Sequence, residues 1–166
     1  MILLVEDDPK DVTLAEFALK RILPGIQINV VSDGLTAVSY LAGDGPYTDR
    51  SKYPMPDVVL LDLQLPLLHG FEVVRWIRKQ EKLKSLPVIA LTGSKREEDT
   101  RMAVDAGATT CMLKSQGFRL LAEKVVEIAA PSQPIPKAEI LAPQVAETAV
   151  PFQPENTSPC SRSDAA

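Results

Sequence analysis

Hydrophobic residues in the first 130 positions fall into two kinds of segment that take turns along the chain. One kind is a short apolar run, rich in β-branched residues and without strict alternation, which is typical of a strand buried on both faces of a parallel sheet. These runs lie at Ile2–Val5, Ile26–Val31, Val58–Leu61, Val88–Leu91 and Thr109–Leu113. The pattern therefore predicts five buried strands.

The segments between these runs have helical character, with apolar residues repeating at spacings of three and four. Asp8-Pro9 is typical of an N-cap followed by proline at the first helical position, and Gly25 is a plausible helix stop. Further helices are predicted at Leu35–Leu41, Gly70–Gln80, Glu97–Ala106 and Phe118–Ala129. Five strands alternating with five helices predict right-handed βαβ units, and thus an α/β fold whose parallel sheet is covered on both faces.

Two stretches interrupt or end this pattern. Residues 42–56, which contain several glycines and prolines, predict a longer loop before the third strand. Residues 131–166 hold seven of the fourteen prolines and no convincing period, so they bury too little apolar surface to offset the entropy of ordering. We therefore predict one domain over residues 1–130 and a Pro-rich flexible tail over 131–166, with no room for an output domain.

Composition and charge exclude several classes of partner. With 45% hydrophobic residues, 24% charged residues and a net charge of −4, the chain is close to an average soluble protein and gives no reason to expect nucleic-acid binding. No stretch approaches the ~20 apolar residues of a membrane span, and no signal-peptide pattern is present. Cys111 and Cys160 lie far apart without metal-ligand spacing, which favours reduced thiols and a cytoplasmic location.

Polar side chains follow four of the predicted strands. The first strand runs into Glu6-Asp7, the third ends at Asp62, the fourth at Thr92 and the fifth at Lys114. In an open parallel sheet, ligands gather beyond the carboxyl ends of the strands, where the strand order reverses. If strands one and three are neighbours, the three carboxylates converge and repel one another unless protons or a hard cation intervene. Mg²⁺ is the natural candidate, because it prefers oxygen ligands.

This combination of residue types suits phosphoryl transfer. Asp62 can attack phosphorus to give an acyl phosphate, while a neighbouring cation neutralises the developing charge. The ammonium group of Lys114 can pair with phosphoryl oxygens, and the hydroxyl of Thr92 can donate a hydrogen bond to another of them. Asp8 taken alone is better explained as a helix cap.

Four motifs carry a family resemblance that covers residues 1–130 in order and at the expected spacing. They are Leu3-Leu-Val-Glu-Asp-Asp8, Val58-Val-Leu-Leu-Asp-Leu-Gln-Leu-Pro66, Leu91-Thr-Gly93, and Ala106-Gly-Ala108 through Lys114. Together they resemble the receiver domain of two-component response regulators. The resemblance implies a flavodoxin-like (βα)5 fold with strand order 2-1-3-4-5.

The same resemblance implies a role for each residue of the site. Asp62 becomes the phosphoacceptor, Glu6 and Asp7 the acidic pair, and the backbone carbonyl of Gln64 a further magnesium ligand beside Asp62. Thr92 becomes the switch hydroxyl and Lys114 the phosphate-pairing lysine.

A narrower similarity points to one subgroup. Tyr40-Leu41, Gly45-Pro-Tyr47, Pro54-Met-Pro-Asp57 and Leu86-Pro-Val-Ile-Ala-Leu-Thr92 look like the regulators paired with bacterial phytochromes. That likeness implies a stand-alone regulator whose partner is a sensor histidine kinase of phytochrome-like type, and it permits a homodimer.

Two positions depart from the family pattern. Ser115 follows Lys114, where the family usually has a proline joined by a cis bond, and a cis bond before serine costs about 2.5–4 kcal/mol. Two alternatives stay open: a strained cis bond, or a different presentation of Lys114. Cys111 stands where many receivers have a switching aromatic, and we interpret it as a strand residue, which leaves coupling through Thr92 or through helix movement open.

Three functions compete. The leading hypothesis is a phosphoacceptor signalling module that is not an enzyme. A phosphoaspartate hydrolase of the haloacid dehalogenase type would need an aspartate two positions after the nucleophile, and Gln64 stands there. A phosphorylation-independent adaptor that binds a partner constitutively is the stronger rival, because Ser115 and Cys111 depart from the pattern. Such an adaptor should be indifferent to Asp62→Ala.

The remaining polar features have simpler interpretations than a role in the site. His69 is expected in a surface loop, and the basic residues Arg75, Arg78, Lys79, Lys82 and Lys84 as cations that meet a helix dipole. The mixed-charge run 95–101 is expected to be a solvated helix face, with a partner or dimer contact as the second interpretation.

Overall fold

A five-stranded parallel sheet forms the centre of the computed structural model, which describes residues 1–129. Its strands are β1 (Ile2–Val5), β2 (Ile28–Val31), β3 (Val58–Asp62), β4 (Val88–Thr92) and β5 (Thr110–Leu113). Their order in the sheet is β2-β1-β3-β4-β5. The predicted flavodoxin-like α/β fold and its strand order are therefore confirmed.

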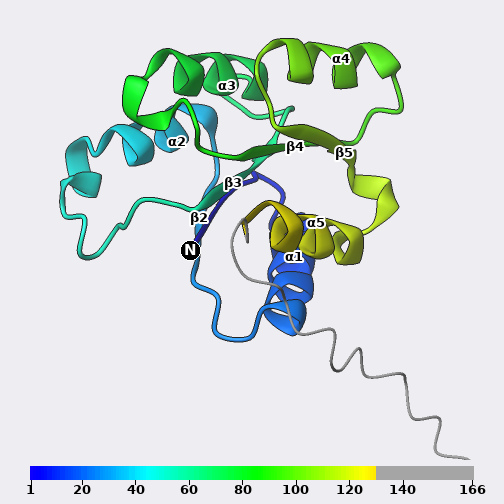
Figure 1. The fold of residues 1–166 in the computed structure, drawn as a ribbon, viewed down its shortest axis with the longest axis horizontal. Helices are drawn as coiled ribbons and strands as arrows, with labels where there is room; N and C mark the ends of the chain where they lie inside the picture. Colours follow the sequence, from blue (N-terminus) through cyan, green and yellow to red (C-terminus); the bar gives the residue numbers. More distant parts are fainter. Residues whose placement is uncertain (130–166) are drawn as a thin grey trace, which may run out of the picture. The chain divides into compact units, whose positions relative to one another are not determined.

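Helices cover both faces of this sheet (Figure 1). The helices are α1 (Pro9–Ile22), α2 (Gly34–Ala42), α3 (Gly70–Lys79), α4 (Glu97–Asp105) and α5 (Phe118–Ala129), with short 3-10 helices η1 (Gly45–Thr48), η2 (Glu81–Leu83) and η3 (Lys114–Gln116). α1 and α5 lie side by side on one face, and α2, α3 and α4 lie on the other (Figure 1). This arrangement leaves the carboxyl ends of the strands open at one edge.

Strand β1 shows why the apolar runs lack alternation. Its side chains point to the two faces in turn, so that Leu3 and Val5 join the core under α2 and α3, while Ile2 and Leu4 join the core under α1 and α5. All four residues are buried. A strand that is buried on both faces has no solvated position to fill with a polar residue.

Local capping explains where two helices begin. The side chain of Asp8 accepts a hydrogen bond from Lys10 N at 2.8 Å, so α1 begins at Pro9 as predicted. The side chain of Asp33 accepts one from Thr36 N at 2.7 Å, so α2 begins at Gly34, one residue before the predicted start. Carboxylate caps of this kind satisfy amide groups that have no partner within the helix.

The stretch 42–56 is more ordered than the loop that its glycines and prolines predict. It contains η1, and the rings of Tyr40, Tyr47 and Tyr53 pack against one another, with centroids 5.0 Å apart for Tyr40–Tyr47 and for Tyr47–Tyr53. Arg50 donates hydrogen bonds to the carbonyl oxygens of Tyr40 and Leu41 at 2.8 and 2.9 Å. Aromatic packing and one guanidinium group therefore fix a segment that turn residues alone would leave open.

Two further predictions concern the C-terminal tail and membrane-spanning segments. The tail predicted for 131–166 lies outside the described residues. In the described part, 1–129, no helix has both the length and the apolar character needed to cross a membrane.

Candidate functional site

The sheet order brings the polar strand ends to one edge. β1 lies between β2 and β3, and its residue Val5 pairs in register with Leu61, so Glu6 and Asp62 follow on neighbouring strands. On the other side of β3, Asp62 pairs in register with Leu91, which places Thr92 at the end of the next strand. Lys114 comes directly after β5. Parallel pairing thus gathers residues that are more than 100 positions apart.

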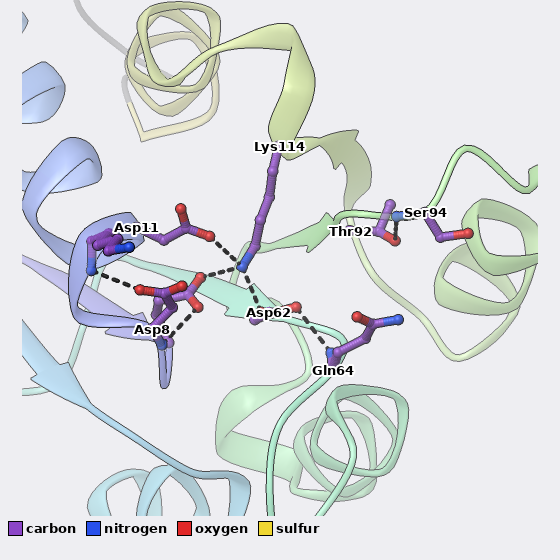
Figure 2. Close-up of polar contacts among 9 residues, drawn as sticks. Asp8, Asp11, Asp62, Gln64, Thr92, Ser94 and Lys114 are labelled. Atoms are coloured by element: carbon purple, nitrogen blue, oxygen red, sulfur yellow. Dashed lines mark hydrogen bonds and ion pairs between the residues drawn. The ribbon is translucent and has the colours of Figure 1, made fainter.

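Lys114 reaches across this edge to three carboxylates. Its Nζ lies 2.6 Å from Asp62 Oδ2, 2.7 Å from Glu6 Oε2 and 2.9 Å from Asp11 Oδ2. Figure 2 shows the lysine side chain extending from the end of β5 toward Asp11 and Asp62. One cation therefore holds together acidic groups from β1, α1 and β3.

The peptide bond after Lys114 settles the alternatives left by Ser115. No peptide bond in residues 1–129 is cis, so Lys114 is joined to Ser115 by a trans bond and continues into η3. The lysine nevertheless reaches Asp62. The second alternative, a different presentation of Lys114, is the one the structure adopts.

Asp11 is a member of the site that sequence reasoning missed. It lies in the first turn of α1, four residues after Asp7, and its carboxylate is one of the three partners of Lys114. The signal was present: a first-turn acid on the helix that follows β1 lies next to the strand end. At the start of α1, only the N-cap residue, Asp8, was interpreted from the sequence.

The carboxylates predicted as metal ligands lie together. Glu6, Asp7 and Asp62 each offer an oxygen, and these oxygens all lie within 4.8 Å of one another. Glu6 and Asp62 are buried, with 2% and 4% of their surface exposed, whereas Asp7 is exposed. Glu6 Oε2 is buried beside Nζ of Lys114 but receives no directed hydrogen bond. A buried carboxylate oxygen with spare acceptor capacity, next to two further carboxylates, fits an oxygen-liganded divalent cation.

Backbone amides orient two of these carboxylates. Asp62 Oδ1 accepts a hydrogen bond from Gln64 N at 2.9 Å, and Glu6 Oε1 accepts one from Asp8 N at 3.2 Å. Asp62 therefore has one oxygen directed to the backbone of Gln64 and the other to Lys114. The first of these contacts places the Gln64 backbone beside the predicted phosphoacceptor.

Thr92 lies at the same edge but outside the ion-pair cluster. Its side chain is buried, and Oγ1 accepts a hydrogen bond from Ser94 N at 3.1 Å (Figure 2). A hydroxyl that accepts one bond still has its proton to donate. The structure therefore brings Glu6, Asp7, Asp62 and Lys114 together directly and leaves Thr92 one strand away.

Burial and ion pairing shift two pKa values in this cluster. Burial raises the pKa of the Glu6 carboxyl above its ordinary value, and the charge of Asp62 acts in the same direction, while Lys114 opposes both. Burial alone would lower the pKa of Lys114, but close contacts with Asp62, Glu6 and Asp11 outweigh it and raise that pKa. Lys114 is thus a permanent cation among carboxylates that repel one another.

Three residues outside the cluster are placed by the structure. Cys111 lies in β5, as predicted, and burial raises the pKa of its thiol. His69 is exposed and precedes α3. Arg78 lies in the last turn of α3, as predicted for a cation that meets the helix dipole, and its half-buried guanidinium group also donates to the carbonyl oxygens of Gly107 at 2.7 Å and Leu86 at 2.9 Å.

Known proteins are similar to this chain in sequence. The family model of the response regulator receiver domain matches residues 2–126. The chain is 34% identical over 125 residues to response regulator Rcp1 of Synechocystis sp., an alignment that covers 75% of this chain and 83% of Rcp1. It is also 36% identical over 131 residues to the probable methanogenesis regulatory protein FilR2 of Methanothrix harundinacea, covering 77% and 80% of the two chains.

Solved structures agree with the sequence comparison. The phosphorylated cyanobacterial phytochrome response regulator RcpA is similar with a TM-score of 0.70 at 32% identity, over 81% of this chain and 96% of that one. The Mn²⁺-bound form of response regulator Rcp1 gives 0.65 at 30% identity, over 81% and 97%. Bacteriophytochrome response regulator AtBRR gives 0.68 at 33%, over 81% and 94%. With the fold and the strand-end cluster, these matches show that the chain belongs to the response regulator receiver domain family, a family of non-enzymatic signalling domains.

Proposed function

We propose that this chain is a response regulator that accepts a phosphoryl group on Asp62 from a sensor histidine kinase, with Mg²⁺, and signals through a phosphorylation-dependent change of its interaction surface. The observation that carries the proposal is the contact of 2.6 Å between Asp62 and Lys114 in a buried carboxylate cluster. An ion pair with a purely structural role would not require a third carboxylate, Asp7, nearby. A phosphoryl-transfer site does, because it needs a metal cation held next to its nucleophile.

The transfer itself requires little from the protein besides placement. A carboxylate oxygen of Asp62 attacks phosphorus, a P–O bond forms, and the P–N bond to the histidine of the donor breaks. Asp62 is held ready for this attack by Gln64 N on one oxygen and Lys114 on the other. After transfer, the ammonium group of Lys114 remains within reach of the phosphoryl oxygens as a point charge.

The metal ligands in this proposal are Glu6, Asp7, Asp62 and the backbone carbonyl of Gln64. When bound there, Mg²⁺ neutralises charge on the phosphoryl oxygens. The Mn²⁺-bound form of response regulator Rcp1 supports a divalent cation in a protein of this fold. The buried Glu6 Oε2, which receives no directed hydrogen bond, supports a cation in this chain.

Thr92 is proposed as the group that reads the phosphorylation state. Its hydroxyl proton is available to donate to a phosphoryl oxygen, while the same oxygen accepts a hydrogen bond from Ser94 N. A shift of Thr92 toward the phosphoryl group would therefore act on the segment that leads into α4. Cys111 offers no ring that could take part in such a shift.

We base the partner on the similarity to phytochrome response regulators. RcpA and AtBRR are named for phytochromes, and the motifs around Tyr40 and Gly45 resemble the same subgroup. The proposed donor is accordingly a phytochrome-like histidine kinase, and a cytoplasmic homodimer is the proposed form of the regulator.

The test is phosphorylation by acetyl phosphate, with and without Mg²⁺, followed by intact-mass spectrometry. We expect wild type to gain one phosphoryl group only with Mg²⁺, and Asp62→Asn to gain none. Asp105→Asn is the matched control, because it removes an exposed aspartate of α4 and should leave the adduct unchanged.

The rival function gives a different outcome. A constitutive adaptor would take up no phosphoryl group in a sample whose fold is verified by circular dichroism, and Asp62→Ala would leave its partner binding intact. An adduct that persists in Asp62→Asn would equally contradict the assignment of Asp62.

A further inference from the structure

Lys114 has one carboxylate partner that the proposed metal site does not use. Of the three acids around Nζ, Glu6 and Asp62 belong to the group of oxygens within 4.8 Å that fits a cation, and Asp11 does not. Asp11 lies 2.9 Å from Nζ and has no other side-chain hydrogen bond in residues 1–129. Its contact with the lysine therefore needs an explanation of its own.

The number of partners matches the chemistry of the ammonium group. A lysine ammonium has three N–H donors and no acceptor, and here three carboxylate oxygens lie at 2.6–2.9 Å. Two of these contacts, to Asp11 and Asp62, are directed hydrogen bonds, and the contact with Glu6 is an ion pair without a directed hydrogen bond. Lysine carries its charge on a flexible four-carbon stem, so its direction depends on such partners.

The backbone around Lys114 increases this dependence. The bond to Ser115 is trans, and the lysine begins the short helix η3. Its side chain must then be directed by contacts made at its tip. Asp11 supplies one from α1, which packs closely beside α5 and is held by the cap of Asp8.

We propose that Asp11 is a positioning residue for Lys114, which keeps the ammonium group directed at Asp62 while Glu6 and Asp62 engage a cation and a phosphoryl group. The inference rests on the proposed function. In the phosphorylated protein, a phosphoryl oxygen takes the place of Asp62 Oδ2 beside the ammonium group, and Asp11 remains as the hydrogen-bond partner from outside the metal site.

A simpler role for Asp11 has to be separated from this one. An acidic residue in the first turn of a helix is favoured by the helix dipole whether or not it contacts a lysine. A dipole effect depends on charge, so Asp11→Asn and Asp11→Ala should have equal consequences. A positioning contact depends on an acceptor oxygen as well, and Asn retains one.

The first test measures Mg²⁺-dependent phosphorylation rates with acetyl phosphate. We expect a fall of about tenfold in Asp11→Ala and a clearly smaller fall in Asp11→Asn, since a charge-assisted hydrogen bond is about twice as strong as a neutral one. Glu16→Gln is the matched control: it removes one charge from the same helix, where Glu16 pairs with Lys20 at the surface, and should leave the rate unchanged. Thermal melts establish that every variant is folded.

The second test does not need phosphorylation. The ammonium group of Lys114 is followed by ¹H–¹⁵N NMR, with its signal assigned by its loss in Lys114→Arg. Three tight contacts should protect the signal from exchange in wild type and in Glu16→Gln, and it should broaden or vanish in Asp11→Ala.

The outcomes separate the two proposals. If wild type takes up no phosphoryl group, the proposed function fails, and the NMR experiment alone tests whether Asp11 positions Lys114. A protected signal that persists in Asp11→Ala overturns the inference. An unchanged phosphorylation rate in Asp11→Ala, or equal losses in the Ala and Asn variants, overturns it too.

Discussion

Helices α3 and α4 cover the same face of the sheet and differ by one residue in length, yet they are attached to it very differently. α3 buries four residues, Gly70, Val73, Val74 and Ile77. α4 buries only Ala103. Since burial of apolar side chains is the main force that holds a helix on a sheet, α3 is a fixed part of the fold and α4 is weakly held.

The beginnings of the two helices differ in the same way. A Cβ atom added to Gly70 would lie 2.4 Å from the carbonyl oxygen of Asp62, so α3 starts in direct contact with the end of β3. A Cβ atom on Gly93, in the segment before α4, would meet nothing within 4 Å. The N-cap residue of α4, Arg96, makes no side-chain cap hydrogen bond.

This difference has a direct bearing on signalling. The proposed phosphoacceptor must keep its geometry, and the helix that follows it is anchored accordingly. The segment after Thr92 borders the same site but is free of such anchors. A surface change driven by phosphorylation is least costly where few buried contacts have to break, which is at α4.

The largest predicted effect compares one apolar residue from each helix. Ile77→Ala should destabilise the fold by about 2–5 kcal/mol, because it leaves a cavity under α3, where Ile77 is completely buried. Val104→Ala on α4 should change the free energy of unfolding by less than about 0.5 kcal/mol, because 52% of Val104 is exposed. Urea denaturation measures both, and equal costs would remove the contrast between the helices.

The second prediction concerns the guanidinium group that ties α3 to its surroundings. Arg78→Ala leaves the carbonyl oxygens of Gly107 and Leu86 without their donors and should cost about 2 kcal/mol. Arg75→Ala is the matched control, because Arg75 is exposed on the same helix. Since Gly107 follows α4, hydrogen exchange near its C-terminal end should also speed up in Arg78→Ala. A stability equal to that of Arg75→Ala would show that the Arg78 contacts contribute nothing.

Most of the fold could be predicted from sequence, because its main determinant is local. The five apolar runs and the Asp8-Pro9 start signal identify elements that neighbouring residues specify by themselves. The boundary shift at Gly34 follows from the cap of Asp33, a local signal that was overlooked, whereas the ordered stretch around η1 was missed because it depends on packing among Tyr40, Tyr47 and Tyr53. Contacts among these three rings produce no periodic hydrophobic pattern in the sequence.

The site shows the same division. Glu6, Asp7, Asp62 and Lys114 could be predicted to converge because they end strands, and a parallel sheet places strand ends at one edge. Arg78 and Asp11 could not be assigned in this way, since they lie within helices α3 and α1 and do not end strands. Arg78 was interpreted from its own helix, as a cation at its end, and Asp11 was not singled out.

A third prediction tests whether the weakly held helix responds to the site. Thr92→Val keeps the size of a buried side chain but removes the oxygen that accepts from Ser94 N, at a cost of about 1 kcal/mol. Asp62 should still be phosphorylated. In wild type, hydrogen exchange in α4 should differ between the phosphorylated and the unphosphorylated protein. In Thr92→Val this difference should disappear. A full response of α4 in Thr92→Val would exclude the hydroxyl as the coupling group.

The smallest effect concerns Cys111, which is half-buried in β5, the strand that α4 packs against. In a Cys160→Ser variant it is the single thiol. Burial, the largest influence, disfavours the thiolate and raises the pKa above its ordinary value of 9.0, and the thiolate is the form that reacts with iodoacetamide.

Alkylation of Cys111 should therefore be slower at pH 8 than in the same protein unfolded in urea, and should rise with pH through a midpoint above about 9. Because α4 covers this thiol, the rate at fixed pH measures how often the helix opens. Phosphorylation should raise the rate in the folded protein and leave the rate in urea unchanged. If folded and unfolded protein react equally fast, α4 gives Cys111 no protection, and the helix is detached from β5 before any signal arrives.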